Sequence, residues 1–69
     1  MKKELYTVRE LEETTGENIQ EVLQDYIESC ARTGHLDPEE NINYFMRENG
    51  IKKTEYNFLY ELYLHIENS

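Results

Sequence analysis

The chain has 69 residues, with 15 Asp and Glu against seven Lys and Arg, which gives a formal net charge of −8. This length predicts a single domain, residues 1–69, whose small core would gain stability from self-association or a partner. The charge argues against binding to nucleic acid or anionic membranes, and the 38% apolar content argues against a disordered chain.

The first predicted helix covers residues 8–15. Thr7 and Glu10 match the capping box T-V-R-E, in which each side chain bonds the backbone N–H of the other residue. Leu5 is expected to pack against the helix start as a hydrophobic staple. Three positions are expected to face the core, namely Val8, Leu11 and Thr15.

The second predicted helix has the most regular pattern in the chain. Asn18 caps its start, and Gly34 follows its end. Apolar side chains recur at i, i+3, i+4, i+7, i+8 and i+11, which defines one face of a helix. These residues are Ile19, Val22, Leu23, Tyr26, Ile27 and Cys30.

Two further helices are predicted. The third begins at Asp37-Pro38, runs to about Asn49 and is followed by Gly50. Its apolar stripe is Ile42, Phe45 and Met46. The fourth runs from about Thr54 to about Glu67. Its main face is Phe58, Leu59, Leu62, Tyr63 and Ile66. With no strand-period pattern, the sequence predicts an all-α fold, a small compact domain of about four short helices.

The predicted fourth helix has a second apolar flank, formed by Tyr56, Tyr60 and Leu64 at i, i+4 and i+8. A helix that is apolar around most of its circumference is usually buried on several sides. Two interpretations stay open. The tyrosines are half-exposed with their hydroxyls in water, or the flank is a surface for self-association or a second partner. We predict a homodimer formed through this C-terminal helix.

The sequence offers little for catalysis or for cofactor and metal binding. His35 and His65 are isolated, and Cys30 lies on an apolar face, where a cysteine behaves as a small hydrophobe. We therefore predict no catalytic, cofactor-binding or metal site, and a protein that is not an enzyme. A single cysteine also favours a reducing compartment, and no apolar run reaches the length of a membrane span, so we predict a cytoplasmic protein.

Acidic residues are concentrated between residues 10 and 28, which contain no Lys or Arg. They are Glu10, Glu12, Glu13, Glu17, Glu21, Asp25 and Glu28. On the second helix, Glu21, Asp25 and Glu28 would form one stripe opposite the apolar face, repeating every 5 to 6 Å or about one turn. Such a row resembles the phosphates of a nucleic-acid strand. The alternative is a solvated face that only provides solubility.

The segment Leu5-Tyr6-Thr7-Val8-Arg9-Glu10-Leu11, with Thr15-Gly16, resembles the opening of MerR-type and excisionase-type winged-helix regulators. That resemblance implies a helix-turn-helix whose second helix reads DNA with Arg, Ser and Thr. Residues 17–25 instead read E-N-I-Q-E-V-L-Q-D, and these carboxylates would repel phosphate. The DNA-binding function of that family is therefore not expected here.

A second resemblance is to the last domain of ArdA-type antirestriction proteins, which are acidic mimics of DNA. That domain has a tyrosine-valine start, then E-E-T-G, then L-Q-x-Y-I-D. The matching residues are Tyr6, Val8, Glu12-Glu13-Thr14-Thr15-Gly16 and Leu23-Gln24-Asp25-Tyr26-Ile27-Glu28. The spacing differs slightly, and residues 40–69 show no such likeness. The resemblance implies DNA mimicry, in agreement with the charge pattern.

The favoured hypothesis is a small acidic inhibitor, of the kind made by phages or mobile elements. It would use the seven acids of residues 10–28 to bind a basic DNA-binding host protein and block its nucleic-acid site. Candidate partners are a nucleoid protein, an RNA polymerase subunit or a restriction or defence enzyme. The alternative is a helical adaptor that binds a protein through Tyr56, Tyr60 and Leu64. The basic cluster Arg47, Lys52 and Lys53 is too small for useful DNA affinity.

Overall fold

A computed structural model describes residues 4–68, which form four α-helices and one 3-10 turn. In chain order these elements are α1 (Val8–Thr15), α2 (Ile19–Thr33), α3 (Pro38–Asn49), η1 (Lys53–Glu55) and α4 (Tyr56–Glu67). The all-α prediction is confirmed, and the expected bounds of the first helix match α1. Within residues 4–68 the β-type pairing is an isolated parallel bridge between Tyr6 and Ile51.

The expected capping residues begin the first three helices. The Thr7 hydroxyl accepts from the Glu10 N–H at 3.1 Å, and the Glu10 carboxylate accepts from the Thr7 N–H at 2.9 Å. Asn18 and Asp37 cap α2 and α3 with their side-chain oxygens. These caps satisfy N–H groups that have no partner within the helix. Gly50 ends α3 with φ 65°, a conformation that residues with a Cβ adopt at a cost.

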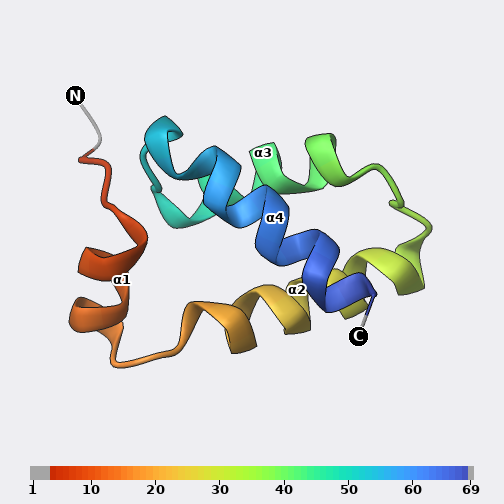
Figure 1. The fold of residues 1–69 in the computed structure, drawn as a ribbon, viewed down its shortest axis with the longest axis horizontal. Coiled ribbons are helices and arrows are strands. Elements are labelled where there is room, and N and C mark those ends of the chain that lie inside the picture. Colours follow the sequence, from red (N-terminus) through yellow and green to blue (C-terminus); the bar gives the residue numbers. More distant parts are fainter. Residues whose placement is uncertain (1–3, 69) are drawn as a thin grey trace.

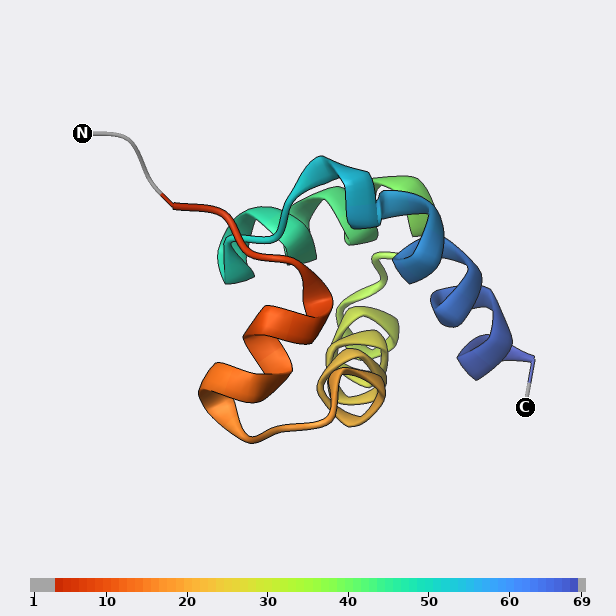
Figure 2. The ribbon, with the colours of Figure 1, turned by 60° about the vertical axis from the view of Figure 1, so that its left-hand side comes forward.

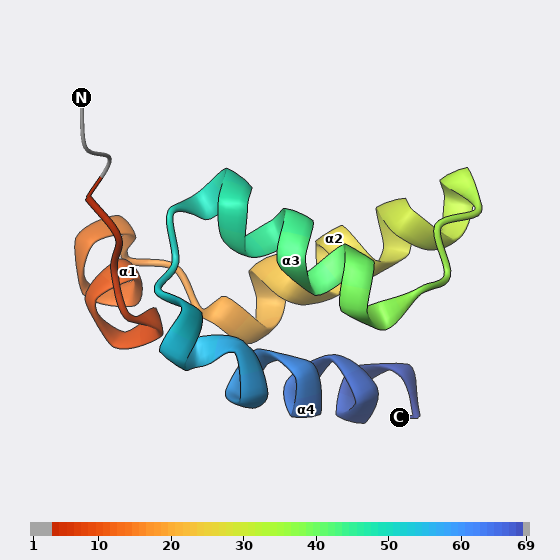
Figure 3. The same cartoon turned by 90° about the horizontal axis from the view of Figure 1, so that it is seen from above.

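The helices are arranged around α2. Figure 1 shows α2 along one side of the molecule, and Figure 2 shows α1, α3 and α4 forming an arch over it. From above, α3 and α4 run side by side along the length of the molecule (Figure 3). The buried core lies inside this arch and comprises Val8, Ile19, Leu23, Ile42, Phe45, Met46, Ile51, Leu59 and Tyr63. The opposite side of α2 faces away from the other helices.

Hydrogen bonds join the start of α1 to distant parts of the chain. The Tyr6 N–H donates to the Gly50 carbonyl at 2.7 Å, and the Lys52 N–H donates to the Tyr6 carbonyl at 2.8 Å. The Glu55 carboxylate, 47 residues along the chain, accepts from the Val8 N–H at 2.7 Å. Val8 is the buried residue of α1. The N-terminal segment is therefore fixed to the turn between α3 and α4.

Three sequence-based expectations about packing are wrong. Leu5 is 45% exposed and lies near Met46 rather than stapling α1, because its segment runs extended beside the α3–α4 turn. Thr15 is exposed, and its hydroxyl donates to the Leu11 carbonyl at 2.9 Å. Phe58 is 52% exposed, because α4 turns Leu59 toward the core and one residue is a rotation of about 100°.

The described part of the chain contains no helix with the length and apolar character needed to cross a bilayer. The longest of its helices, α2, has 15 residues, with an apolar face on one side and an acidic face on the other. An amphipathic helix of this kind packs one face on a core and leaves the other in solvent.

Candidate functional site

We define the acidic stripe as Glu17, Glu21, Asp25 and Glu28, which begins in the loop before α2 and continues along the side of the helix opposite its buried residues. All four residues are exposed, Glu17 in the loop before α2 and the others on the helix. From Glu21 to Glu28 the stripe rises by about 10 Å along the helix axis. Arg32, one turn further on, is the first cation after Arg9 and ends the run of negative charge. Glu21, Asp25 and Glu28 thus share one outer face of α2, whereas Glu17 lines a small pocket at the junction of α1 and α2 with residues that include Leu11, Glu12 and Ile19.

Glu10, which the sequence also placed in the partner-binding set, has a structural role. Its carboxylate completes the capping box at the start of α1. The hydrogen bond from the Thr7 backbone, and then that from the Thr7 side chain, lowers the pKa of Glu10 below its ordinary value. Glu10 therefore stays ionised at neutral pH and contributes to the negative field while stabilising α1.

Glu12 and Glu13 also have partners within the chain. The Glu12 carboxylate accepts from the Ile19 N–H at 2.8 Å, so α1 caps the start of α2 across the loop. Glu13 pairs with Arg9 at 3.6 Å on an exposed face of α1. An exposed pair of this kind contributes little stability. The predicted set of seven acids therefore divides into the four residues of the acidic stripe and three that interact within or beside α1.

The second predicted surface, formed by Tyr56, Tyr60 and Leu64, is half-buried. The rings of Tyr56 and Tyr60 stack at 5.8 Å between centroids, and both pack against the core. Burial is the first cause that raises the pKa of Tyr56, followed by the nearby Glu39 carboxylate. The two tyrosines thus serve the core in part, and Leu64 is the member that lies outside the core contacts.

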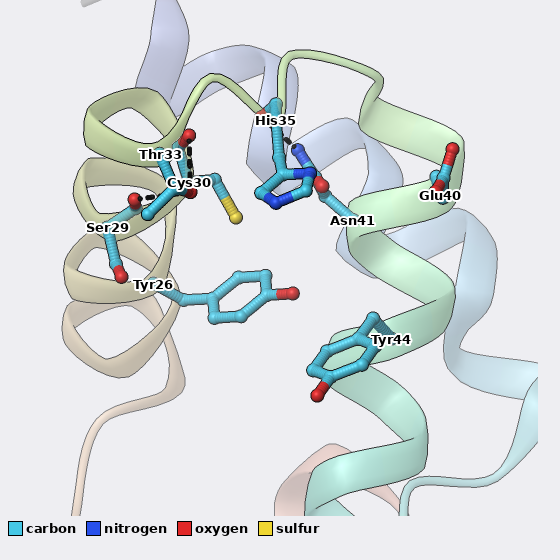
Figure 4. A pocket seen from close by; sticks show the side chains of 8 residues that line it. All are labelled: Tyr26, Ser29, Cys30, Thr33, His35, Glu40, Asn41 and Tyr44. Atoms are coloured by element: carbon cyan, nitrogen blue, oxygen red, sulfur yellow. Dashed lines mark hydrogen bonds between the residues drawn. The ribbon is translucent and has the colours of Figure 1, made fainter.

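The structure also reveals a pocket that sequence reasoning missed, between the C-terminal half of α2 and the N-terminal half of α3. We call it the α2–α3 pocket. Its volume is about 390 Å³. Residues from both helices and from the loop between them line it, including Tyr26, Ser29, Cys30, His35, Asn41 and Tyr44. In Figure 4 the Tyr26 ring extends from α2 toward α3, below the Cys30 sulfur and the His35 ring.

Asn41 fixes one wall of the α2–α3 pocket. It is 5% exposed, and its amide nitrogen donates to the His35 carbonyl at 2.8 Å and to the Tyr63 hydroxyl at 2.9 Å. Burial raises the pKa of Tyr63, and the hydrogen bond with Asn41 opposes that shift. This network ties the loop, α3 and α4 together, so the wall of the pocket is held in place. An asparagine at one position gives no sequence signal for this role.

Two tyrosines line the pocket, Tyr26 from α2 and Tyr44 from α3. Tyr26 packs on Phe45, with centroids 5.2 Å apart and the planes tilted by 49°. Burial, and then a hydrogen bond with Cys30, raises the pKa of Tyr26 well above its ordinary range. Tyr44 is 52% exposed, and its hydrogen bond with Glu48 raises the pKa of its phenol. Both hydroxyls are therefore protonated at neutral pH.

The described residues contain no group of three or more His, Cys, Asp or Glu side chains placed to hold a metal ion. Cys30, His35 and Glu40 all line the pocket, but they are not among any such group. A zinc site would need three or four such ligands.

The basic cluster lies elsewhere, around the turn between α3 and α4. Arg47 and Lys53 line a groove of about 480 Å³ together with Leu5, Met46 and Ile51. Lys52 is exposed beside it. The cations and the acidic stripe therefore belong to different surfaces of the protein.

Comparisons of the chain with protein-family models, curated proteins and solved structures found no match. The resemblances to MerR-type regulators and to ArdA-type proteins therefore stay predictions.

Proposed function

We propose that this protein is a small acidic inhibitor that binds a basic DNA-binding protein and blocks its nucleic-acid site. The observation that supports this function best is the acidic stripe. Glu17, Glu21, Asp25 and Glu28 are all exposed, and the last three lie on the side of α2 opposite its buried residues Ile19, Leu23 and Cys30. A basic groove that accepts phosphates would attract this surface by the same electrostatic interaction.

The arrangement of charge on α2 is unfavourable for the protein alone. Like charges at i and i+4, such as Glu21 and Asp25, destabilise a helix by about 0.2–0.5 kcal/mol per pair. A lysine at either position would turn the repulsion into attraction without disturbing the core, because both residues are exposed. A partner that binds the negative stripe gives a reason for its presence.

The first experiment identifies the partner. The protein is immobilised and exposed to a bacterial lysate at about 50 mM salt, and bound proteins are eluted at about 500 mM salt. We expect a DNA-binding protein that is retained only at low salt. A partner retained equally at both salt concentrations would argue against electrostatic mimicry.

The second experiment tests the stripe. The double variant Glu21→Lys with Asp25→Lys is compared with Glu61→Lys with Glu67→Lys, which changes two exposed acids of α4. Both variants have a net charge of −8 + 4 = −4. We expect the stripe variant to lose its ability to displace labelled DNA from the partner, and the α4 variant to retain most of it. If both variants lost this ability equally, net charge alone would explain the effect, and the position of the stripe would not matter.

A second candidate function is a helical adaptor that binds a protein, or a second copy of this chain, through α4. Leu64 supports it, because this apolar residue is half-exposed and lies outside the core contacts. Leu64→Asp therefore tests the surface without removing a core residue. The adaptor function predicts that this variant loses the partner, or the dimer mass measured by light scattering, while the stripe variant retains it.

A further inference from the structure

Aromatic rings form two sides of the α2–α3 pocket. Tyr26 and Tyr44 come from facing helices, and both line the same cavity of about 390 Å³. Phe45 supports the Tyr26 ring at 5.2 Å, so its orientation is fixed by packing. The faces of aromatic rings carry partial negative charge and attract cations that lie within about 6 Å of the ring centre.

The charges around the pocket also favour a cation. Neither Lys nor Arg lines it, whereas Glu40 does. Glu48 and Arg47 both act on the Tyr44 phenol, and the hydrogen bond with Glu48 has the larger effect, so the pKa of Tyr44 is raised. Asp25 of the acidic stripe lies one helical turn before Ser29, which lines the pocket, so the two surfaces adjoin on α2.

The polar atoms of the pocket indicate which kind of cation fits. Asn41 uses its two amide hydrogens for the His35 carbonyl and the Tyr63 hydroxyl, so its remaining hydrogen-bonding atom is an acceptor. Tyr26 also brings a hydroxyl oxygen to the lining, and Glu40 lines the cavity from the far side of α3 in Figure 4. Acceptors in the same cavity as two aromatic rings suit a flat cation with several N–H groups. An arginine guanidinium has five donors in a plane and stacks on aromatic rings, whereas an ammonium is a compact point charge.

From this combination we infer that the α2–α3 pocket binds the guanidinium group of an arginine side chain. The source of that arginine is the basic partner of the proposed function, and to that extent the inference rests on it. The acidic stripe then attracts the partner over its length, and the pocket adds one specific contact beside the stripe. A surface of charge alone would accept lysine and arginine equally, whereas this pocket distinguishes them.

A small probe tests the pocket without the partner. N-acetyl-arginine methyl ester is titrated into the protein at pH 7.5, and amide chemical shifts are followed by NMR. The citrulline analogue has nearly the same shape without the charge, and the lysine analogue has the charge without the plane. We expect saturable shifts at Ser29, Thr33 and Asn41 with the arginine ester. The citrulline and lysine analogues should bind at least about fivefold more weakly. Equal binding of citrulline or lysine, tighter binding of a neutral ring such as phenol, or shifts away from the pocket would overturn the inference.

A matched pair of variants localises the effect. Tyr44 and Phe58 are both 52% exposed aromatic residues, on α3 and α4 respectively. Tyr44→Ala should weaken binding of the arginine ester about three- to fivefold. Phe58→Ala should leave it unchanged, and equal weakening in both variants would contradict the assigned site.

The outcomes separate this inference from the proposed function. If the arginine ester binds the pocket but the wild-type protein displaces no DNA from any bound protein, the proposed function fails and the assignment of the pocket is retained. If the stripe variant no longer displaces DNA but the arginine ester does not bind the pocket, the inference fails and the proposed function is supported.

Discussion

Individual carboxylates in this protein have two different roles. Glu12 and Glu55 accept hydrogen bonds from the first backbone N–H groups of helices to which they do not belong, at 2.8 and 2.7 Å. A negative charge at a helix N-terminus also interacts favourably with the helix dipole. The acidic stripe residues, by contrast, are exposed. A count of acids along the chain does not separate the two roles, because each depends on which backbone group lies nearby in the fold.

The cap at Glu10 predicts a specific pH dependence. Because the pKa of Glu10 is lower in the folded chain, its stabilisation is present above the unfolded pKa and is lost as the pH falls through the folded pKa. Glu10→Gln has no such titration. We therefore expect the wild type to melt at a higher temperature than Glu10→Gln near neutral pH, with the difference shrinking toward about pH 3.

Circular dichroism melts across this pH range measure that difference. Glu61→Gln is the control, because it removes one exposed acid of α4. A difference between wild type and Glu10→Gln that stays constant, or that grows in acid, would contradict the capping role.

At the scale of the elements, the helices follow from the local sequence and their contacts do not. The cap residues Thr7, Asn18 and Asp37 and the periodic face of α2 determine where helices begin and which side is buried. The α2–α3 pocket depends instead on how closely two helices approach, and periodicity contains no such information. Phe58 was misplaced for a related reason, since a helix apolar on several sides does not reveal which side its neighbours cover.

The contact between Asn41 and Tyr63 predicts a measurable coupling between α3 and α4. Tyr63→Phe leaves one buried amide hydrogen of Asn41 without its acceptor, which typically costs about 1–3 kcal/mol. We expect Tyr63→Phe and Asn41→Ala to destabilise the protein by less together than the sum of their separate effects, with a coupling of about 0.5–3 kcal/mol. Urea unfolding of the four proteins measures this coupling.

Tyr60→Phe is the control for Tyr63→Phe. It removes a hydroxyl from the same helix at a half-buried position that stacks on Tyr56. We expect a change within about 0.5 kcal/mol. If Tyr60→Phe and Tyr63→Phe lower the stability equally, the Asn41–Tyr63 hydrogen bond contributes no more than an ordinary tyrosine hydroxyl.

At the scale of the whole molecule, charge and size act against each other. The net charge of −8 is confined to a body of about 33 × 24 × 19 Å, so most charges repel one another across a short distance. Such self-repulsion destabilises a compact state, and a chain this short has little core to offset it. Any cationic partner that reduces the repulsion therefore also stabilises the fold.

Salt should consequently have opposite effects on the protein alone and on its complex. Raising the salt concentration from about 0.1 M to about 1 M shortens the Debye length from about 10 Å to about 3 Å. We expect the melting temperature of the free protein to rise over this range and the complex with its basic partner to weaken. The Glu61→Lys, Glu67→Lys variant, with its net charge of −4, should show a smaller rise. A melting temperature that falls with salt would mean that attractive ion pairs outweigh the repulsion.

The pairing of Tyr6 with Ile51, and of Val8 with Glu55, has a consequence for the order in which the molecule is made. Synthesis proceeds from the N-terminus, so α1 leaves the ribosome long before the residues that hold its start. During that interval the start of α1 lacks its partners Gly50, Lys52 and Glu55, and the acidic tract of residues 10–28 emerges ahead of the α3 and α4 residues that complete the core. The acidic tract is therefore exposed before the fold is complete. Docking of the start of α1 is a late step of folding.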